Sequence, residues 1–276
     1  MNSVLKSIKT ELDRAFRNGK MLWVLLAGCL ISVLQIIVDV LPVVSNQESG
    51  TFTAFPFTVF EKYIGLIAGS VFPYYYYMFI PLVAAVPVAL TAYTDRKSGY
   101  IKNVFTRTEK KNYYVAKNLA AFISAGVVTT VPQILNLLIV AALLPSIQPY
   151  PGIGYVGISS DAMWADLFYA HAYFYIILYL VFNFIFYGLL NTFAVALSWF
   201  YQNWFAVLLT PFLTLQFLSF ACKVFGQEQL RPENFLIPSQ LMGNTSKTEI
   251  LLLIVFFLVV SVLAIVYGVK KGNYYE

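Results

Sequence analysis

The sequence has few charged residues, and this excludes an ordinary soluble fold. Only 11% of its 276 residues are charged, whereas 59% are hydrophobic. Soluble domains carry roughly 25% charged residues on average. A chain with so little charge has too few polar side chains to cover a globular surface in water. The composition therefore predicts an integral membrane protein.

Motifs for nucleotide binding and catalysis are also absent from the sequence. The one Gly-Lys pair, Gly19-Lys20, is followed by Met21 and lacks the spacing of a phosphate-binding loop. No HExxH, GxSxG or cysteine cluster occurs, and the single histidine, His171, has no evident triad partner. We therefore expect no catalytic, cofactor-binding or metal-binding residues here, and we expect that the chain is not an enzyme.

Cysteine and charge each exclude a further class of function. Cys29 and Cys222 lie in apolar runs without a close pairing partner, which favours small buried residues over a disulfide or a metal site. The formal net charge is +5, but the basic residues cluster beside apolar segments. This pattern is typical of membrane topology, so we expect the lipid bilayer as a partner and no nucleic acid.

Six apolar runs are long enough to cross a bilayer, which takes about 20 residues per helix. We place the spans at residues 21–44, 71–93, 119–144, 167–198, 204–224 and 250–269. The fourth run is too long for one crossing at about 1.5 Å per residue, so it must tilt, break or extend beyond the membrane, with a turn near 198–203. The sequence thus predicts an all-α polytopic membrane protein, with residues 1–276 forming a single transmembrane domain.

Three segments outside the spans have distinct patterns. Residues 1–19 place apolar side chains at helical spacing among basic ones, which predicts an amphipathic interfacial helix. Residues 45–70 are too apolar for free solution and too interrupted to span, so we expect them at the outer interface. Residues 225–249 contain Pro232, Pro238 and Gly243, which favours either an external interfacial loop or re-entrant half-helices.

The distribution of basic residues predicts the orientation of the chain. Seven of the 18 Lys and Arg residues lie between Asp95 and Lys117, five lie in the N-terminal segment and two at the C-terminus. Eight of the 13 acidic residues fall in the segments on the other side. Because basic loops stay in the cytoplasm, we expect a multi-pass protein of the cell membrane with residues 95–117 and both termini cytoplasmic.

The order of these segments resembles the permease subunit of ABC transporters of the ABC-2 type, a group of exporters. In that family the loop after the second span carries an acidic residue, a glycine, an arginine, a tyrosine and a lysine. The matching residues here are Asp95, where Glu is commoner, Gly99, Arg107, Tyr114 and Lys117. A second, loose match covers the fourth and fifth spans at Gly188, Ser198, Asn203, Ala206 and Pro211.

The resemblance implies a half-transporter driven by ATP. Two permease subunits, as a homodimer or heterodimer, would combine with cytoplasmic ATP-binding subunits that hold ATP and Mg. The loop at 95–117 would form a short coupling helix that docks on the ATPase, and we assign this contact to Asp95, Gly99, Tyr100, Lys102, Phe105 and Arg107. The same basic loop is also explained as a topological anchor attracted to anionic lipids, without any partner.

The sequence allows two explanations of the candidate path residues and two classes of transporter. Tyr75 and Tyr77 in the second span and Asn183 and Asn191 in the fourth are candidates to line a path for a peptide, drug or amphipathic lipid-like molecule. Ordinary helix packing explains the same residues, with interhelical hydrogen bonds worth about 0.6 kcal/mol each. A secondary transporter or channel not driven by ATP is the alternative function, although its usual internal repeats and buried ionisable residues are not clear here.

Overall fold

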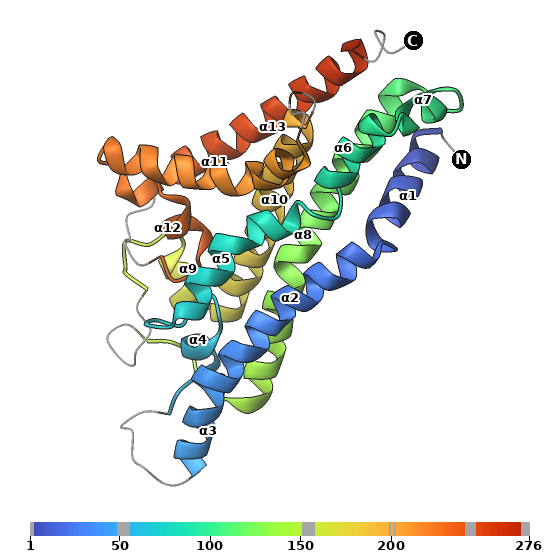
Figure 1. Ribbon diagram of the computed structural model, residues 1–276. Coiled ribbons are helices and arrows are strands. Elements are labelled where there is room, and N and C mark those ends of the chain that lie inside the picture. The colour runs from blue at the N-terminus through green and yellow to red at the C-terminus, as the bar shows by residue number, and fades with distance from the viewer. Residues whose placement is uncertain are drawn as a thin grey trace.

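The protein is a bundle of helices, described by a computed structural model over residues 3–48, 56–150, 158–198, 200, 203–240 and 247–271. All regular elements in these ranges are helices. Six helices are long and apolar enough to cross a membrane (Figure 1). They cover Gly19–Ser45, Val71–Lys97, Lys110–Leu143, Ala172–Leu197, Trp204–Val224 and Lys247–Lys270. The prediction of an all-α membrane protein with six spans is confirmed.

The first span is preceded by a separate short helix. This helix, α1 (Ser3–Phe16), ends at a bend before α2 (Gly19–Gln35). The Asn18 side chain accepts a hydrogen bond from the backbone N–H of Lys20 and so caps the start of α2. A π-helical turn (Ile36–Val40) and α3 (Leu41–Glu48) continue the first span.

The second span is broken at a proline. Its first half is α5 (Val71–Ala84) and its second half is α6 (Ala89–Lys97), separated by a turn that contains Pro87. Proline lacks the N–H for the helical hydrogen bond, and its ring clashes with the carbonyl four residues earlier. Pro87 thus accounts for the break, whereas Pro81 lies within α5 without interrupting it.

The third span, α8 (Lys110–Leu143), is the central helix of the bundle. Its 34 residues correspond to about 51 Å at about 1.5 Å per residue. A bilayer core is about 30 Å thick, so α8 must tilt or extend beyond it. The helix packs against α1, α2, α5, α10 (Ala172–Leu197) and α13 (Lys247–Lys271), which makes it the common support of the molecule.

Glycines allow α8 and α10 to approach closely. A Cβ atom on Gly126 would lie 2.5 Å from a ring carbon of Phe184, and one on Gly188 would lie 2.6 Å from a ring carbon of Phe122. Each helix therefore places a phenylalanine ring over a glycine of the other. The two rings meet edge to face, with their centroids 5.6 Å apart.

The long fourth run breaks near its N-terminal end instead of forming one helix. His171, with φ −148° and ψ 77°, separates α9 (Ala165–Ala170) from α10. The chain then turns into α11 (Trp204–Val224), and part of this turn lies outside the described residues. The helices α12 (Pro232–Leu236) and α13 follow; of the predicted external segment, residues 241–246 lie outside the described residues.

The connections opposite to α7 form a cap on the bundle, which we call the cap end. It consists of α4 (Val59–Lys62), α9 and α12 with their flanking residues (Figure 1). Gln240 joins them, because its side-chain amide oxygen accepts from the Met163 N–H at 2.8 Å and its NH₂ group donates to the Met163 carbonyl at 2.9 Å. The backbone N–H of Ser239 donates to the Gly65 carbonyl at 3.0 Å.

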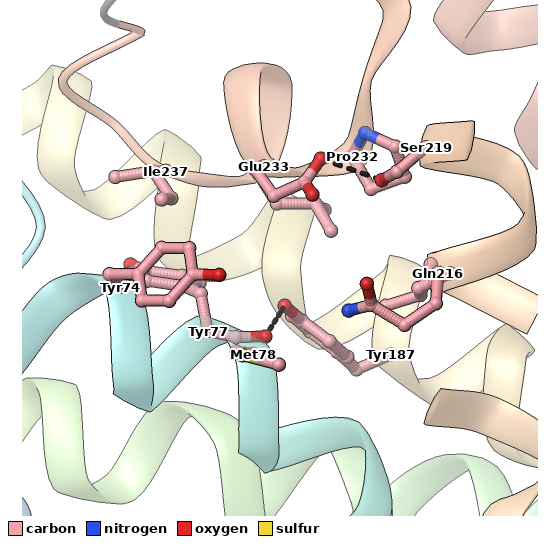
Figure 2. A pocket seen from close by; sticks show the side chains of 11 residues that line it. Tyr74, Tyr77, Met78, Tyr187, Gln216, Ser219, Pro232, Glu233 and Ile237 are labelled. Atoms are coloured by element: carbon pink, nitrogen blue, oxygen red, sulfur yellow. Dashed lines mark hydrogen bonds between the residues drawn. The ribbon is translucent and has the colours of Figure 1, made fainter. Parts of the chain in front are cut away.

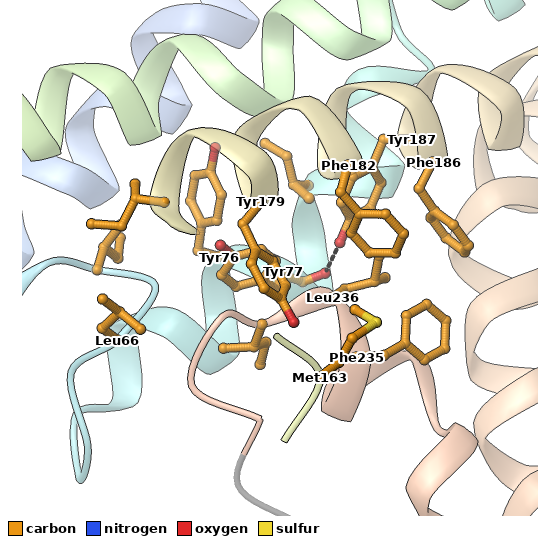
Figure 3. Packing of buried hydrophobic residues seen from close by; sticks show 14 of the residues in the cluster. Leu66, Tyr76, Tyr77, Met163, Tyr179, Phe182, Phe186, Tyr187, Phe235 and Leu236 are labelled. Atoms are coloured by element: carbon orange, nitrogen blue, oxygen red, sulfur yellow. Dashed lines mark hydrogen bonds between the residues drawn. The ribbon is translucent and has the colours of Figure 1, made fainter. Parts of the chain in front are cut away.

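Aromatic side chains fill the space beneath the cap. Figure 3 shows Tyr179, Phe182 and Phe186 of α10 against Phe235 of α12 and against Met163. The Phe186 and Phe235 rings meet edge to face at 5.6 Å between centroids. The cap is thus continuous with the core of the bundle.

The segment before α5 packs into the bundle. We expect residues 45–70 at the outer interface, and within this segment Tyr63 and Ile64 are completely buried by other parts of the chain. Two amide side chains hold this segment by its backbone: Asn136 Oδ1 accepts from the Ile64 N–H at 2.9 Å, and Gln35 donates to the Lys62 carbonyl at 3.1 Å. Residues 49–55 lie outside the described residues.

Candidate functional site

The predicted coupling segment is largely helical and lies at one end of the bundle, which we call the α7 end. It comprises the last turn of α6, the short helix α7 (Tyr100–Phe105) and the first turns of α8. Gly99 joins α6 to α7 with a left-handed φ of 72°, a conformation that favours glycine. The start of α1 and the end of α13 lie at the same end (Figure 1).

Asp95 is buried at this end, in a cluster of charged residues from three helices. Its side chain contacts Lys117 Nζ at 2.8 Å through Oδ2 and Arg14 Nη2 at 2.6 Å through Oδ1. The Tyr113 hydroxyl donates to Oδ2 at 3.1 Å. Only 4% of Asp95 is exposed. Asp95 therefore positions α1, α6 and α8 relative to one another, and its carboxylate does not face outward.

Glu11 completes the cluster and balances its charge. Its Oε2 accepts from Lys117 Nζ at 3.0 Å, and its Oε1 accepts from Arg14 Nη1 at 2.8 Å. We call these four residues, Glu11, Arg14, Asp95 and Lys117, the ion cluster. Burial acts to lower the pKa of the Arg14 guanidinium, but the hydrogen bonds that it donates to Asp95 and the charges of Glu11 and Asp95 outweigh burial and raise that pKa above its ordinary value.

The exposed residues of the predicted coupling segment lie on α7 and directly after it. Lys102 and Arg107 are exposed, and Tyr100 is partly exposed with the Arg14 guanidinium 4.5 Å from its ring centroid. Phe105 packs inward against Tyr113 at 5.9 Å between ring centroids. The structure thus separates the six predicted residues into an outward basic and aromatic face and an inward set that supports it.

The sequence reasoning missed the two members of the ion cluster on α1. Glu11 and Ala15 are the two buried residues of this helix, and they lie four positions apart on one face. An acidic residue on the same face as Ala15, within a basic segment, was the available signal. Its partner Lys117 lies 106 positions further along the chain, so the pairing cannot be recognised from the local sequence.

The structure does not bring the four predicted path residues onto one surface. Tyr75 is 49% exposed, and its ring stacks on Phe79. Tyr77 is buried and donates its hydroxyl to Gln133 at 3.2 Å.

The two asparagines of α10 are both buried but differ in their hydrogen bonds. The Asn191 side chain donates to the carbonyls of Ala121 at 3.0 Å and Ala84 at 3.4 Å, so it links α10 to α8 and α5. Asn183 is completely buried, and neither atom of its amide has a hydrogen-bond partner in the described part of the chain. Asn191 thus has a packing role, whereas nothing in the structure explains the amide of Asn183.

A small pocket lies among α5, α11 and α12 (Figure 2). Polar groups of Tyr74, Tyr187, Gln216 and Glu233 surround it, and the Ser219 hydroxyl donates to Glu233 at 2.6 Å. Its accessible volume is about 20 Å³, which is room for about one water molecule. A cargo molecule does not fit into this pocket within one chain.

The α7 end is therefore the candidate functional site of this chain. It combines an exposed basic helix, α7, with the ion pairs of the ion cluster, which hold α1, α6 and α8 together. Comparison with models of protein families, with curated proteins and with solved structures found no match to this chain.

Proposed function

We propose that the chain is the membrane-spanning permease subunit of an ATP-driven exporter of the ABC-2 type, located in the cell membrane. In this proposal the α7 end faces the cytoplasm, α7 docks on a separate subunit that binds ATP and Mg, and a second permease subunit completes the transporter. The observation that supports it most is α7 itself, a short surface helix that carries the exposed Lys102, is followed two residues later by the exposed Arg107 and lies beside the ion cluster.

The ion cluster explains how a movement of α7 would reach the spans. Asp95 lies two residues before the end of α6, and Gly99 and Tyr100 follow directly. Removing one partner from a buried ion pair destabilises a protein by about 3–5 kcal/mol, so the cluster resists separation of α1, α6 and α8. A push on α7 would therefore move these helices together and be passed to the second and third spans.

The proposed cargo path lies on the exposed face of α5 and α11. Tyr75 stacks on Phe79 and Phe79 stacks on Phe212, with 6.3 and 6.4 Å between ring centroids. A second subunit facing this surface would enclose a path for a peptide, drug or amphipathic molecule. The buried residues Tyr77, Asn183 and Asn191 would act from behind it, by setting the packing of α5 and α10.

A photo-crosslinking experiment tests the docking of α7. A photoreactive amino acid at Asn103, which is exposed on α7, is expected to crosslink a protein that carries a phosphate-binding loop. The same group at Ile147, exposed toward the cap end, is the matched control and should not crosslink that protein. An Asn103 adduct without any nucleotide-binding protein would contradict the proposal.

Charge reversal tests the coupling in the reconstituted transporter. Lys102→Glu with Arg107→Glu is expected to lower cargo-stimulated ATP hydrolysis and subunit co-purification at least tenfold, because α7 would then repel an acidic docking surface. Lys223→Glu, an exposed charge at the end of α11, should leave both unchanged. Transport that continues without ATP in the isolated chain would instead favour the secondary transporter or channel.

A further inference from the structure

An open groove lies where α1 meets α2, beside α6. Its volume is about 450 Å³. It is lined by Thr10, Asp13, Arg14, Arg17, Asn18 and Thr91. The ion cluster uses only Arg14 of these residues, so the groove is a separate feature of the α7 end.

The groove contains hydrogen-bond donors for an anion. The Arg17 side chain is 85% exposed, and its Nε lies 4.0 Å from Asp13 Oδ1, a weak contact. Arg14 is fixed in orientation by Asp95. Asn18 accepts from the Lys20 N–H through its amide oxygen, and the NH₂ group of an asparagine amide can donate two further hydrogen bonds. A planar guanidinium matches the paired oxygens of a phosphate.

Two threonines of the groove, one on α1 and one on α6, supply hydrogen-bond acceptors. The Thr10 hydroxyl donates to the Lys6 carbonyl at 2.9 Å, and the Thr91 hydroxyl donates to the Val88 carbonyl at 2.8 Å. Each hydroxyl oxygen then has lone pairs left to accept a hydrogen bond. The groove can therefore pair with a ligand that joins a phosphate to hydroxyl groups.

Exposed apolar side chains begin directly beside the groove. Phe16 is 40% exposed, Leu22 59% and Trp23 73%, and the last two lie in the first turns of a membrane span. Tryptophan is enriched at the level of lipid headgroups. A free phosphate would use only the polar part of this site, whereas a phospholipid would also use the apolar part through its acyl chains.

We propose that this groove binds the headgroup of an anionic phospholipid with a glycerol headgroup, phosphatidylglycerol being the probe. The phosphate contacts Arg17 and the Asn18 amide, the glycerol hydroxyls donate to Thr10 and Thr91, and the acyl chains follow α2. Asp13 opposes binding, because its carboxylate repels the phosphate. This site does not depend on the transport function proposed above.

Lipid binding to the delipidated full-length chain in detergent tests the site by native mass spectrometry. Phosphatidylglycerol is expected to bind more tightly than phosphatidylcholine. Arg17→Gln should weaken it about fivefold, the factor for one basic residue near a lipid surface. Asp13→Asn should tighten it. Lys9→Gln, which removes an equal charge from an exposed position of α1 outside the groove, is the matched control and should change affinity less than twofold.

Three results would overturn the proposal. The first is equal weakening by Arg17→Gln and Lys9→Gln, which would show general attraction to the basic helix. The second is equal affinity for phosphatidylglycerol and phosphatidylcholine. The third is full competition by glycerophosphoglycerol or inorganic phosphate at the lipid's own concentration, which would show that the site takes a soluble phosphate and makes no use of the acyl chains.

Discussion

At the residue scale, Lys117 holds the ion cluster together. Its Nζ atom lies 3.0 Å from Glu11 and 2.8 Å from Asp95, and the side chain is 3% exposed. A lysine so deeply buried is tolerated because two carboxylates surround it. Arg14 supplies the second positive charge, so the four side chains are neutral as a set.

Lys117→Met is therefore predicted to lower the free energy of unfolding by about 3–5 kcal/mol, because it leaves two buried carboxylates to share one guanidinium. The double variant Lys117→Met with Asp95→Asn leaves one acid and one base, and we expect it to recover most of this loss. Denaturant titration of the purified protein in detergent measures both. Lys111→Met, at an exposed position of the same helix, is the control. Equal stability of the single and double variants would show that charge balance is not what stabilises the cluster.

At the element scale, the contact of α8 with α10 depends on two glycines, which have no side chain to keep the helices apart. Gly126 and Gly188 each accept a phenylalanine ring from the other helix. Small residues at such positions let two membrane helices approach closely, and the gain comes from packing rather than from burial out of water. The same use of glycine occurs where α2 meets α8, since a Cβ on Gly28 would lie 2.7 Å from Pro132.

Gly188→Ala is predicted to lower the free energy of unfolding by about 1–3 kcal/mol, the usual effect of overpacking. The new Cβ would lie 2.6 Å from the Phe122 ring and 2.9 Å from the Phe122 carbonyl oxygen, and the carbonyl cannot rotate away. Gly19→Ala is the matched control, because nothing lies within 4 Å of its Cβ position. Thermal unfolding of both variants compares them. If the two lose equal stability, α8 and α10 are not packed as described.

At the scale of the whole molecule, the two ends of the bundle differ in composition. The α7 end gathers α1, α7 and the end of α13, with Asn112 of α8 donating to the Ser3 hydroxyl at 3.1 Å. The cap end is closed by α4, α9 and α12, with a largely apolar and aromatic core. Because most basic residues lie at the α7 end, the fold and the charge pattern favour the same orientation.

The orientation is tested by labelling single cysteines in intact cells, in a variant that lacks Cys29 and Cys222. A cysteine at position 103, on α7, should react with a membrane-impermeant maleimide only after the cells are opened. A cysteine at position 147, near the cap end, should react in intact cells. Both native residues, Asn103 and Ile147, are exposed, so access depends on the side of the membrane. Reaction of position 103 in intact cells would show that the topology is the reverse of the predicted one and would rule out the docking role of α7.

The sequence by itself determined the class of the protein and the approximate places of its spans. The reason is that crossing a bilayer requires long apolar runs with internal backbone hydrogen bonding, and both length and apolarity can be read locally. The exposed basic face around Lys102 and Arg107 was likewise visible as a cluster of charge.

Tertiary structure alone decided which polar residues are paired. Asp95 looked like a residue for a partner protein, but Arg14 and Lys117 surround it. Gln35 and Asn136 bind the backbone of Lys62 and Ile64, a contact that the composition of residues 45–70 does not reveal. Such pairings join positions up to about a hundred residues apart. A buried polar group is stable only where the fold places a hydrogen-bond partner within reach. That condition depends on how the helices pack and is not present in any one segment of the chain.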